Sequence, residues 1–118
     1  MMSLDEKSLE SSILNKTFNF TVNIISYTAE LQKQNRFIIG NQLSKCGTAI
    51  GANTEESENA ESEAVFITKI ETAIKEAAET QHWLSFCATR KNYPNCKDLL
   101  KELAEIINIL NKTIETVK

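Results

Sequence analysis

Apolar residues recur along the chain three or four positions apart, which is the spacing of one face of an α-helix. The first series predicts a helix over about residues 8–33, and its positions are Leu9, Ile13, Thr17, Phe20, Ile24, Tyr27 and Leu31. The later series are Ile39, Leu43, Cys46, Ile50 and Asn53, then Phe66, Ile70, Ala73, Ala77, Thr80, Leu84 and Cys87, then Leu99, Leu103, Ile106, Leu110, Thr113 and Val117. They predict helices at about 37–56, 62–89 and 95–117.

Short polar stretches separate these four series, and no segment shows the period-two alternation of a β-strand. The separators are QKQNR, SENAES and RKNYPN, the last of which contains the one proline of the chain. Helices of similar length joined by short connections most simply form an antiparallel bundle. We therefore expect an all-α, up-down-up-down four-helix bundle, with residues 1–118 as a single domain.

The first predicted helix carries a second apolar series, about 150° around the helix from the first at 100° per residue. Its members are Leu14, Phe18, Val22, Ile25 and Ala29. A bundle core uses only one face of each helix, so this second face predicts contact with another copy of the chain and hence a homo-oligomer.

Two glycines, Gly47 and Gly51, lie four residues apart within the second predicted helix. Each interior glycine costs about 1 kcal/mol of helix stability relative to alanine. We expect close approach of a partner helix to compensate for that cost. Asn53 lies on the apolar series of the same helix, and we expect its amide to be buried and hydrogen-bonded across helices.

Composition limits the class of protein. The chain has 118 residues, of which 42% are hydrophobic and 25% charged, and its formal net charge of −3 argues against nucleic-acid binding by the whole surface. No run approaches the ~18–20 apolar residues that cross a bilayer, and the first residues lack an apolar signal segment. We expect a soluble, cytoplasmic protein without a membrane partner. The three cysteines form no CxxC pair and predict free thiols.

The charges are unevenly distributed. In the predicted topology the first and third connections share one end, called the basic end below, which collects Lys33, Arg36, Lys45, Arg90, Lys91, Lys97 and Lys101. The opposite end collects Glu55, Glu56, Glu58, Glu61 and Glu63. Cations beside Tyr93 and Phe37 are suited to a phosphate backbone. The alternative is that they favour helix dipoles and solubility.

Candidate catalytic chemistry is sparse. Glu79 and His82 form a Glu-x-x-His pair of the kind that di-iron bundles use, but such sites need the motif on two helices and this chain has one histidine. We predict no metal site and no cofactor, and take His82 and Trp83 as packing or interface residues. No Ser/His/Asp set occurs at recognisable spacing. We do not expect an enzyme.

Two stretches, QLSKCGTAIGANTEES (42–57) and SEAVFITKIETAIKEAAETQHWL (62–84), resemble the bacterial 23S rRNA intervening-sequence proteins. The resemblance implies a four-helix bundle that assembles as a ring-shaped homopentamer. By analogy, a related bundle, the accessory protein of diversity-generating retroelements, binds nucleic acid and a reverse transcriptase. The chain departs from the family pattern at Lys45, Cys46, Thr54, Glu55 and His82, which makes the end of the second helix more acidic.

Three hypotheses follow. The favoured one is a non-enzymatic homo-oligomer, a pentamer by resemblance, that acts as a binding or scaffold module for another protein. The alternative is an RNA- or DNA-binding, rRNA-associated protein that uses the basic end. The third is a metal-binding bundle built on Glu79 and His82. The pattern assigns no role to Glu56.

Overall fold

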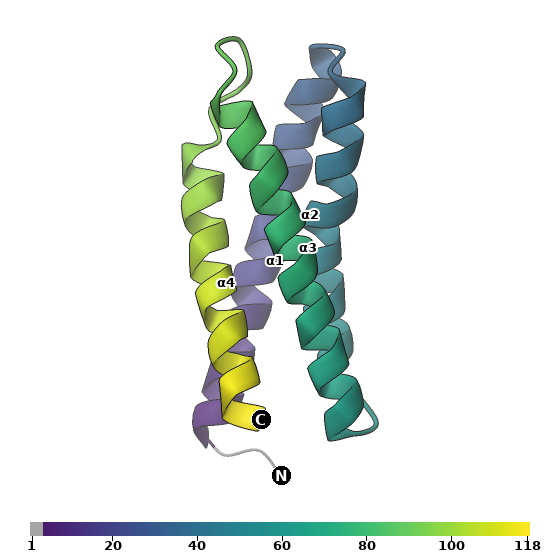
Figure 1. Cartoon of the computed structure of the whole chain (residues 1–118), viewed down its shortest axis with the longest axis vertical. Coiled ribbons are helices and arrows are strands. Elements are labelled where there is room, and N and C mark those ends of the chain that lie inside the picture. Colours follow the sequence, from purple (N-terminus) through teal and green to yellow (C-terminus); the bar gives the residue numbers. More distant parts are fainter. Residues whose placement is uncertain (1–3) are drawn as a thin grey trace.

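The computed structural model describes residues 4–118, with side chains from residue 12 onward, so Leu9 lies outside the described side chains. Four helices make up the described fold: α1 (Leu4–Lys33), α2 (Phe37–Glu58), α3 (Glu63–Ala88) and α4 (Lys97–Val117). Each runs antiparallel to the next (Figure 1). The α1–α2 and α3–α4 connections lie at one end of the bundle, and the α2–α3 connection lies at the other. The predicted all-α four-helix bundle is confirmed.

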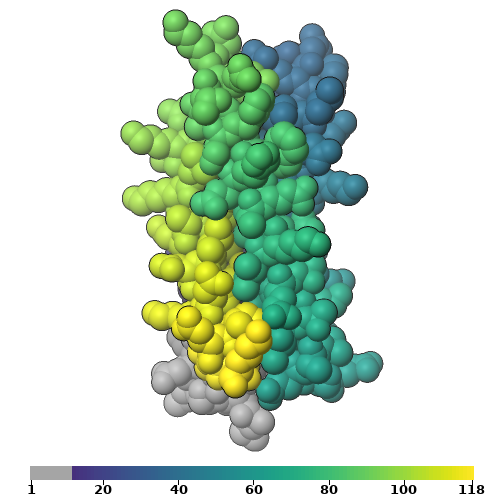
Figure 2. Space-filling view, viewed as in Figure 1, coloured from purple at the N-terminus to yellow at the C-terminus, as the bar shows by residue number. Residues whose placement is uncertain are grey.

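Each helix packs against two neighbours. α1 contacts α2 and α4, and α3 contacts the same two helices from the other side, so α1 and α3 lie diagonally across the bundle. In Figure 1 α3 and α4 lie in front of α1 and α2, and the residues of α3 and α4 form the face towards the viewer in Figure 2. The bundle is elongated, with extents of 49 × 22 × 19 Å.

Most of the core consists of residues that the helical spacing selected, and Cys96 is a buried addition that the spacing did not select. Phe20, Ile24, Leu43 and Leu103 are fully buried, and Thr80 is the polar member of the same series on α3. Three selected residues are only half-buried. Phe66 and Val117 lie in the first turn of α3 and at the end of α4, where the core is incomplete, and the third is Asn53 of α2. Five buried threonines donate their hydroxyl hydrogen bonds to carbonyl oxygens of their own helices, namely Thr17, Thr28, Thr54, Thr80 and Thr113.

The helix ends differ from the predicted ends by four residues at most, and three of the eight ends match. α1 begins at Leu4 instead of residue 8, and α2 continues to Glu58, since no proline or glycine stops either extension. The Ser62 hydroxyl accepts a hydrogen bond from the Val65 amide at 3.2 Å and caps α3. α4 begins at Lys97, later than predicted, because the residues around Pro94 are extended or turn-forming.

Gly47 and Gly51 lie where α2 approaches α1. A Cβ atom at Gly47 would stand 2.8 Å from Ile24 Cγ2, and one at Gly51 would stand 2.9 Å from Thr21 Oγ1 and 3.4 Å from the Thr17 carbonyl oxygen. These distances leave no room for a methyl group. The absence of two side chains therefore sets how closely α2 lies against α1.

Asn53 differs from its expectation. Its side chain is half-buried, and its Nδ2 donates a hydrogen bond to the Ala49 carbonyl oxygen at 2.9 Å, which lies one turn earlier in the same helix. This amide therefore donates within its own helix, whereas a bond across helices was expected. The helix backbone supplies an acceptor at i−4, so the side chain folds back onto α2.

The glycine contacts predict opposite effects for two Gly→Ala changes. Gly47→Ala places a methyl group against the buried Ile24, where overpacking costs about 1–3 kcal/mol and exceeds the gain of about 1 kcal/mol in helix propensity. At Gly40 the new Cβ would meet the flexible end of Gln32, with Nε2 at 3.2 Å, so the propensity gain should prevail.

We expect Gly47→Ala to lower the free energy of unfolding and Gly40→Ala to raise it slightly, measured by urea denaturation at one fixed protein concentration. A Gly47→Ala protein as stable as the Gly40→Ala protein would contradict the steric account.

Candidate interaction surfaces

The outer face of α1 carries a row of apolar side chains that no other helix covers. Phe18 is 66% exposed, Val22 49% and Ile25 53%. Ala29 is exposed as well, and Leu14 is half-buried at the edge of the row. We call these five residues the outer α1 row. Among the described residues six large apolar side chains are exposed, and three of them belong to this row, so its composition is not that of an ordinary helix surface.

The inner face of α1 is fully used by its neighbours, which explains why the outer row has no partner within the chain. Towards α4, Lys16 pairs with Glu105 at 3.0 Å, and Asn23 donates to Glu102 at 3.0 Å. Towards α2, Ile24 lies against Gly47. The outer row points away from both contacts.

The basic end is more extended than its name suggests. Lys33, Arg36, Arg90 and Lys91 belong to the two connections or the helix turns beside them. Lys45, by contrast, lies eight residues after Phe37, the first residue of α2, which is about 12 Å along the helix. Lys97 begins α4 and Lys101 follows about 6 Å further along. The predicted set therefore spreads from the connections down the sides of the bundle.

Two arginines of this end are stacked on aromatic rings. The Arg36 guanidinium lies 4.0 Å from the centroid of the Tyr93 ring, and the Arg90 guanidinium lies 4.7 Å from that of Phe86. Phe86 and Tyr93 meet edge to face with centroids 6.0 Å apart. Each cation–π contact contributes about 0.5–1 kcal/mol at an exposed site, which favours the stacked orientation of the guanidinium about two- to fivefold.

A shallow concavity opens beside this stack, between the start of α2 and the α3–α4 connection. It has a volume of about 480 Å³ and is lined by Asn35, Arg36, Phe37, Ile38, Ile39 and Tyr93. Phe37 is 50% exposed and Ile38 78%. The exposure of Ile38 was missed by the sequence reasoning, although the signal was present: in the run Phe37-Ile38-Ile39 only Ile39 falls on the core spacing.

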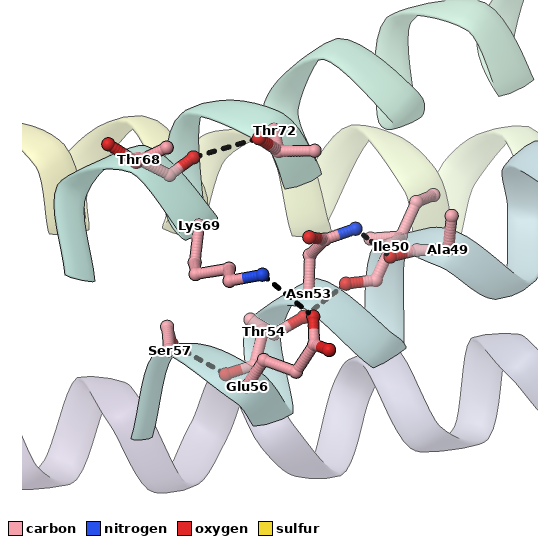
Figure 3. Close-up of polar contacts among 9 residues, drawn as sticks. All are labelled: Ala49, Ile50, Asn53, Thr54, Glu56, Ser57, Thr68, Lys69 and Thr72. Carbon is pink, nitrogen blue, oxygen red and sulfur yellow. Dashed lines mark hydrogen bonds and ion pairs between the residues drawn. The ribbon is translucent and has the colours of Figure 1, made fainter. Parts of the chain in front are cut away.

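A polar cluster joins α2 to α3 near the end opposite the basic end, where the glutamates gather (Figure 3). Lys69 Nζ lies 3.3 Å from Glu56 Oε2, and within this cluster this ion pair is the contact that connects α3 to α2. Ser57 Oγ donates to the Thr54 carbonyl oxygen at 2.6 Å, and Thr72 Oγ1 donates to that of Thr68 at 2.9 Å. Because Lys69 and Glu56 are both substantially exposed, their pair adds at most about 1 kcal/mol. Glu56 thus links α2 to α3 only weakly, and the other bonds stay within single helices.

The thiols are poor nucleophiles. Cys46, Cys87 and Cys96 are free and buried. Burial raises the pKa of each thiol above its ordinary value, so all three are protonated at neutral pH. Near Cys87 and Cys96 the Tyr27 hydroxyl donates to the Pro94 carbonyl oxygen at 2.8 Å, and burial raises the pKa of Tyr27 as well. This group ties α1 to the α3–α4 connection.

The Glu79–His82 pair lies on the surface of α3. Both side chains are exposed, and His82 meets Trp83 edge to face with centroids 5.0 Å apart. In the part of the chain that the structure describes, no three His, Cys, Asp or Glu side chains come together as metal ligands would. Nor does any described helix combine the length and apolar character that crossing a bilayer requires.

The fold and its surfaces define the class of protein: an all-α four-helix bundle whose unusual features face outward, an apolar row on one helix and a stacked cationic end. The chain belongs to the 23S rRNA-intervening sequence protein family, which matches residues 10–112. A solved structure of a protein of unknown function from the S23 ribosomal protein family of Bacteroides thetaiotaomicron is similar, with 32% identity and a TM-score of 0.84. The similarity covers 91% of this chain and 98% of that one. A comparison with curated proteins gives no match.

Proposed function

We propose that the protein is a non-enzymatic, homo-oligomeric helical bundle that acts as a binding or scaffold module, and that the outer α1 row is the contact between copies. The observation that carries this proposal is the exposure of Phe18, Val22 and Ile25 on one side of one helix. A row of large apolar side chains favours burial against another protein surface. Another copy of the chain is a partner that is present wherever the protein itself is present.

The energetics favour a closed assembly. Burying a large apolar side chain completely contributes about 1.5–3 kcal/mol, so the exposed parts of Phe18, Val22 and Ile25 contribute about 2.5–5 kcal/mol together. Association itself costs about 4–15 kcal/mol. One such contact is therefore marginal, whereas in a ring each copy makes two contacts and the ring closes on itself. The pentamer that the family resemblance implies is an assembly of this kind.

A single charge in the row should disrupt the assembly. We expect Phe18→Glu to shift the molar mass measured by size-exclusion chromatography with light scattering from that of an oligomer towards that of the monomer, because a buried unpaired carboxylate is strongly unfavourable. Asn19→Glu is the matched control, since Asn19 is the next residue, is exposed and lies off the row. A Phe18→Glu protein that kept the wild-type mass would refute the proposed contact.

A second candidate function is binding of RNA or DNA at the basic end. Its support is that Arg36, Arg90 and Lys91 make no ion pair with a carboxylate among the described residues, so their charges are available for phosphates. Repetition of the patch around an oligomer would multiply a weak affinity. The net charge of −3 confines this function to the basic end.

Charge reversal at this end tests that candidate. In filter binding with RNA, we expect Arg90→Glu and Lys91→Glu each to weaken retention, and added salt to weaken it further, because counterion release drives such binding. Lys112→Glu, an exposed change on the far half of α4, is the control and should have a smaller effect. Retention that ignored salt and both basic-end changes would exclude the candidate.

A further inference from the structure

We propose that the basic end binds single-stranded nucleic acid, with the ring of Phe37 as the platform on which one unpaired base stacks and the surrounding cations as contacts to the phosphates. The inference rests on the second candidate function and names the form of nucleic acid that the site would take. It depends on the concavity beside Tyr93, where the exposed Phe37 ring and the Arg36 guanidinium occur together.

The first step is the availability of the Phe37 ring. Tyr93 is half-buried, the Arg36 guanidinium covers one face of its ring, and its neighbour Phe86 meets it edge to face. Phe37 lines the same concavity and is 50% exposed. Of the aromatic rings around the concavity, Phe37 is therefore the one most open to a ligand.

The second step is the state of the two arginines. Stacking on Tyr93 and Phe86 favours one orientation of Arg36 and Arg90. The Nε of Arg36 donates a hydrogen bond to Gln34 Oε1 at 2.7 Å. The terminal nitrogens of both guanidinium groups donate to no side chain or carbonyl among the described residues. Planar groups held in position with free N–H donors are well suited to phosphate oxygens.

The third step is the preference for a single strand. A base can stack on a protein ring only when it has left its own helix, which single strands permit and duplexes resist. A long duplex lying along the bundle would also approach the glutamates of the opposite end, and the protein is acidic overall. A short strand seated at the basic end meets mainly cations.

The test compares two probes, a fluorescein-labelled oligouridylate and the same strand annealed to oligoadenylate, by fluorescence anisotropy with the full-length protein at low salt. We expect Phe37→Ser to weaken binding of the single strand about 5- to 160-fold, the range of one base–aromatic stack. Binding of the duplex should be unchanged, and Phe37→Trp should retain single-strand affinity. Val65→Ser is the matched control, because Val65 is an exposed apolar residue in the first turn of α3 at the opposite end.

The outcomes separate the two claims. If Lys91→Glu weakens the single strand while Phe37→Ser does not, the basic end binds phosphates without a stacking platform and this inference fails, although the candidate function stands. Equal loss of single strand and duplex in Phe37→Ser also refutes it. If the wild-type protein binds neither probe, the candidate function fails together with the inference. Circular dichroism of Phe37→Ser establishes that the variant is folded.

Discussion

The close contact between α1 and α2 is the constraint on which the rest of the structure depends. Where α2 passes Ile24 and Thr21, it does so with the bare backbone of Gly47 and Gly51. Two glycines in one helix lower the stability of that helix. The close packing against α1 offsets this loss, because side chains there would force the helices apart. With α2 seated so closely and α4 held by Lys16 and Asn23, α1 has its inner face completely occupied. From residue 12 onward, the apolar residues of α1 that lie off this inner face must therefore face outward.

That division of α1 links the fold to the proposed function. The inner series closes the core, and the outer α1 row has no partner within the described chain. At the end of the bundle a similar division separates Ile39, which joins the core, from Phe37 and Ile38, which do not. Both outward-facing groups are products of helical periodicity: a run of apolar residues longer than one face needs leaves some of them in solvent. The two groups differ in their surroundings, since cations accompany only the second.

Helical spacing in the sequence was sufficient to predict the four helices and most of the core, because burial of one stripe per helix is what makes a bundle stable. Exact ends were harder: nothing in the first residues stops α1, and the turn around Pro94 delays α4. The spacing of apolar residues could not predict contacts between individual residues that are distant in sequence. The stacking of Arg36 on Tyr93 joins two connections, and the choice of Asn53 between its own helix and a neighbour depends on one side-chain rotamer. The family resemblance implies a ring, but no spacing in the sequence specifies the number of subunits.

The central claim is that the outer α1 row joins copies of the chain, and native mass spectrometry of the unaltered protein, purified without nuclease, tests it most directly. One spectrum reports the number of subunits and any nucleic acid that accompanies them. We expect a discrete multimer at micromolar concentration, of five copies if the family ring is kept. A monomer under conditions that preserve non-covalent assemblies would contradict it, and would mean that the exposed Phe18, Val22 and Ile25 do not mark a contact between subunits.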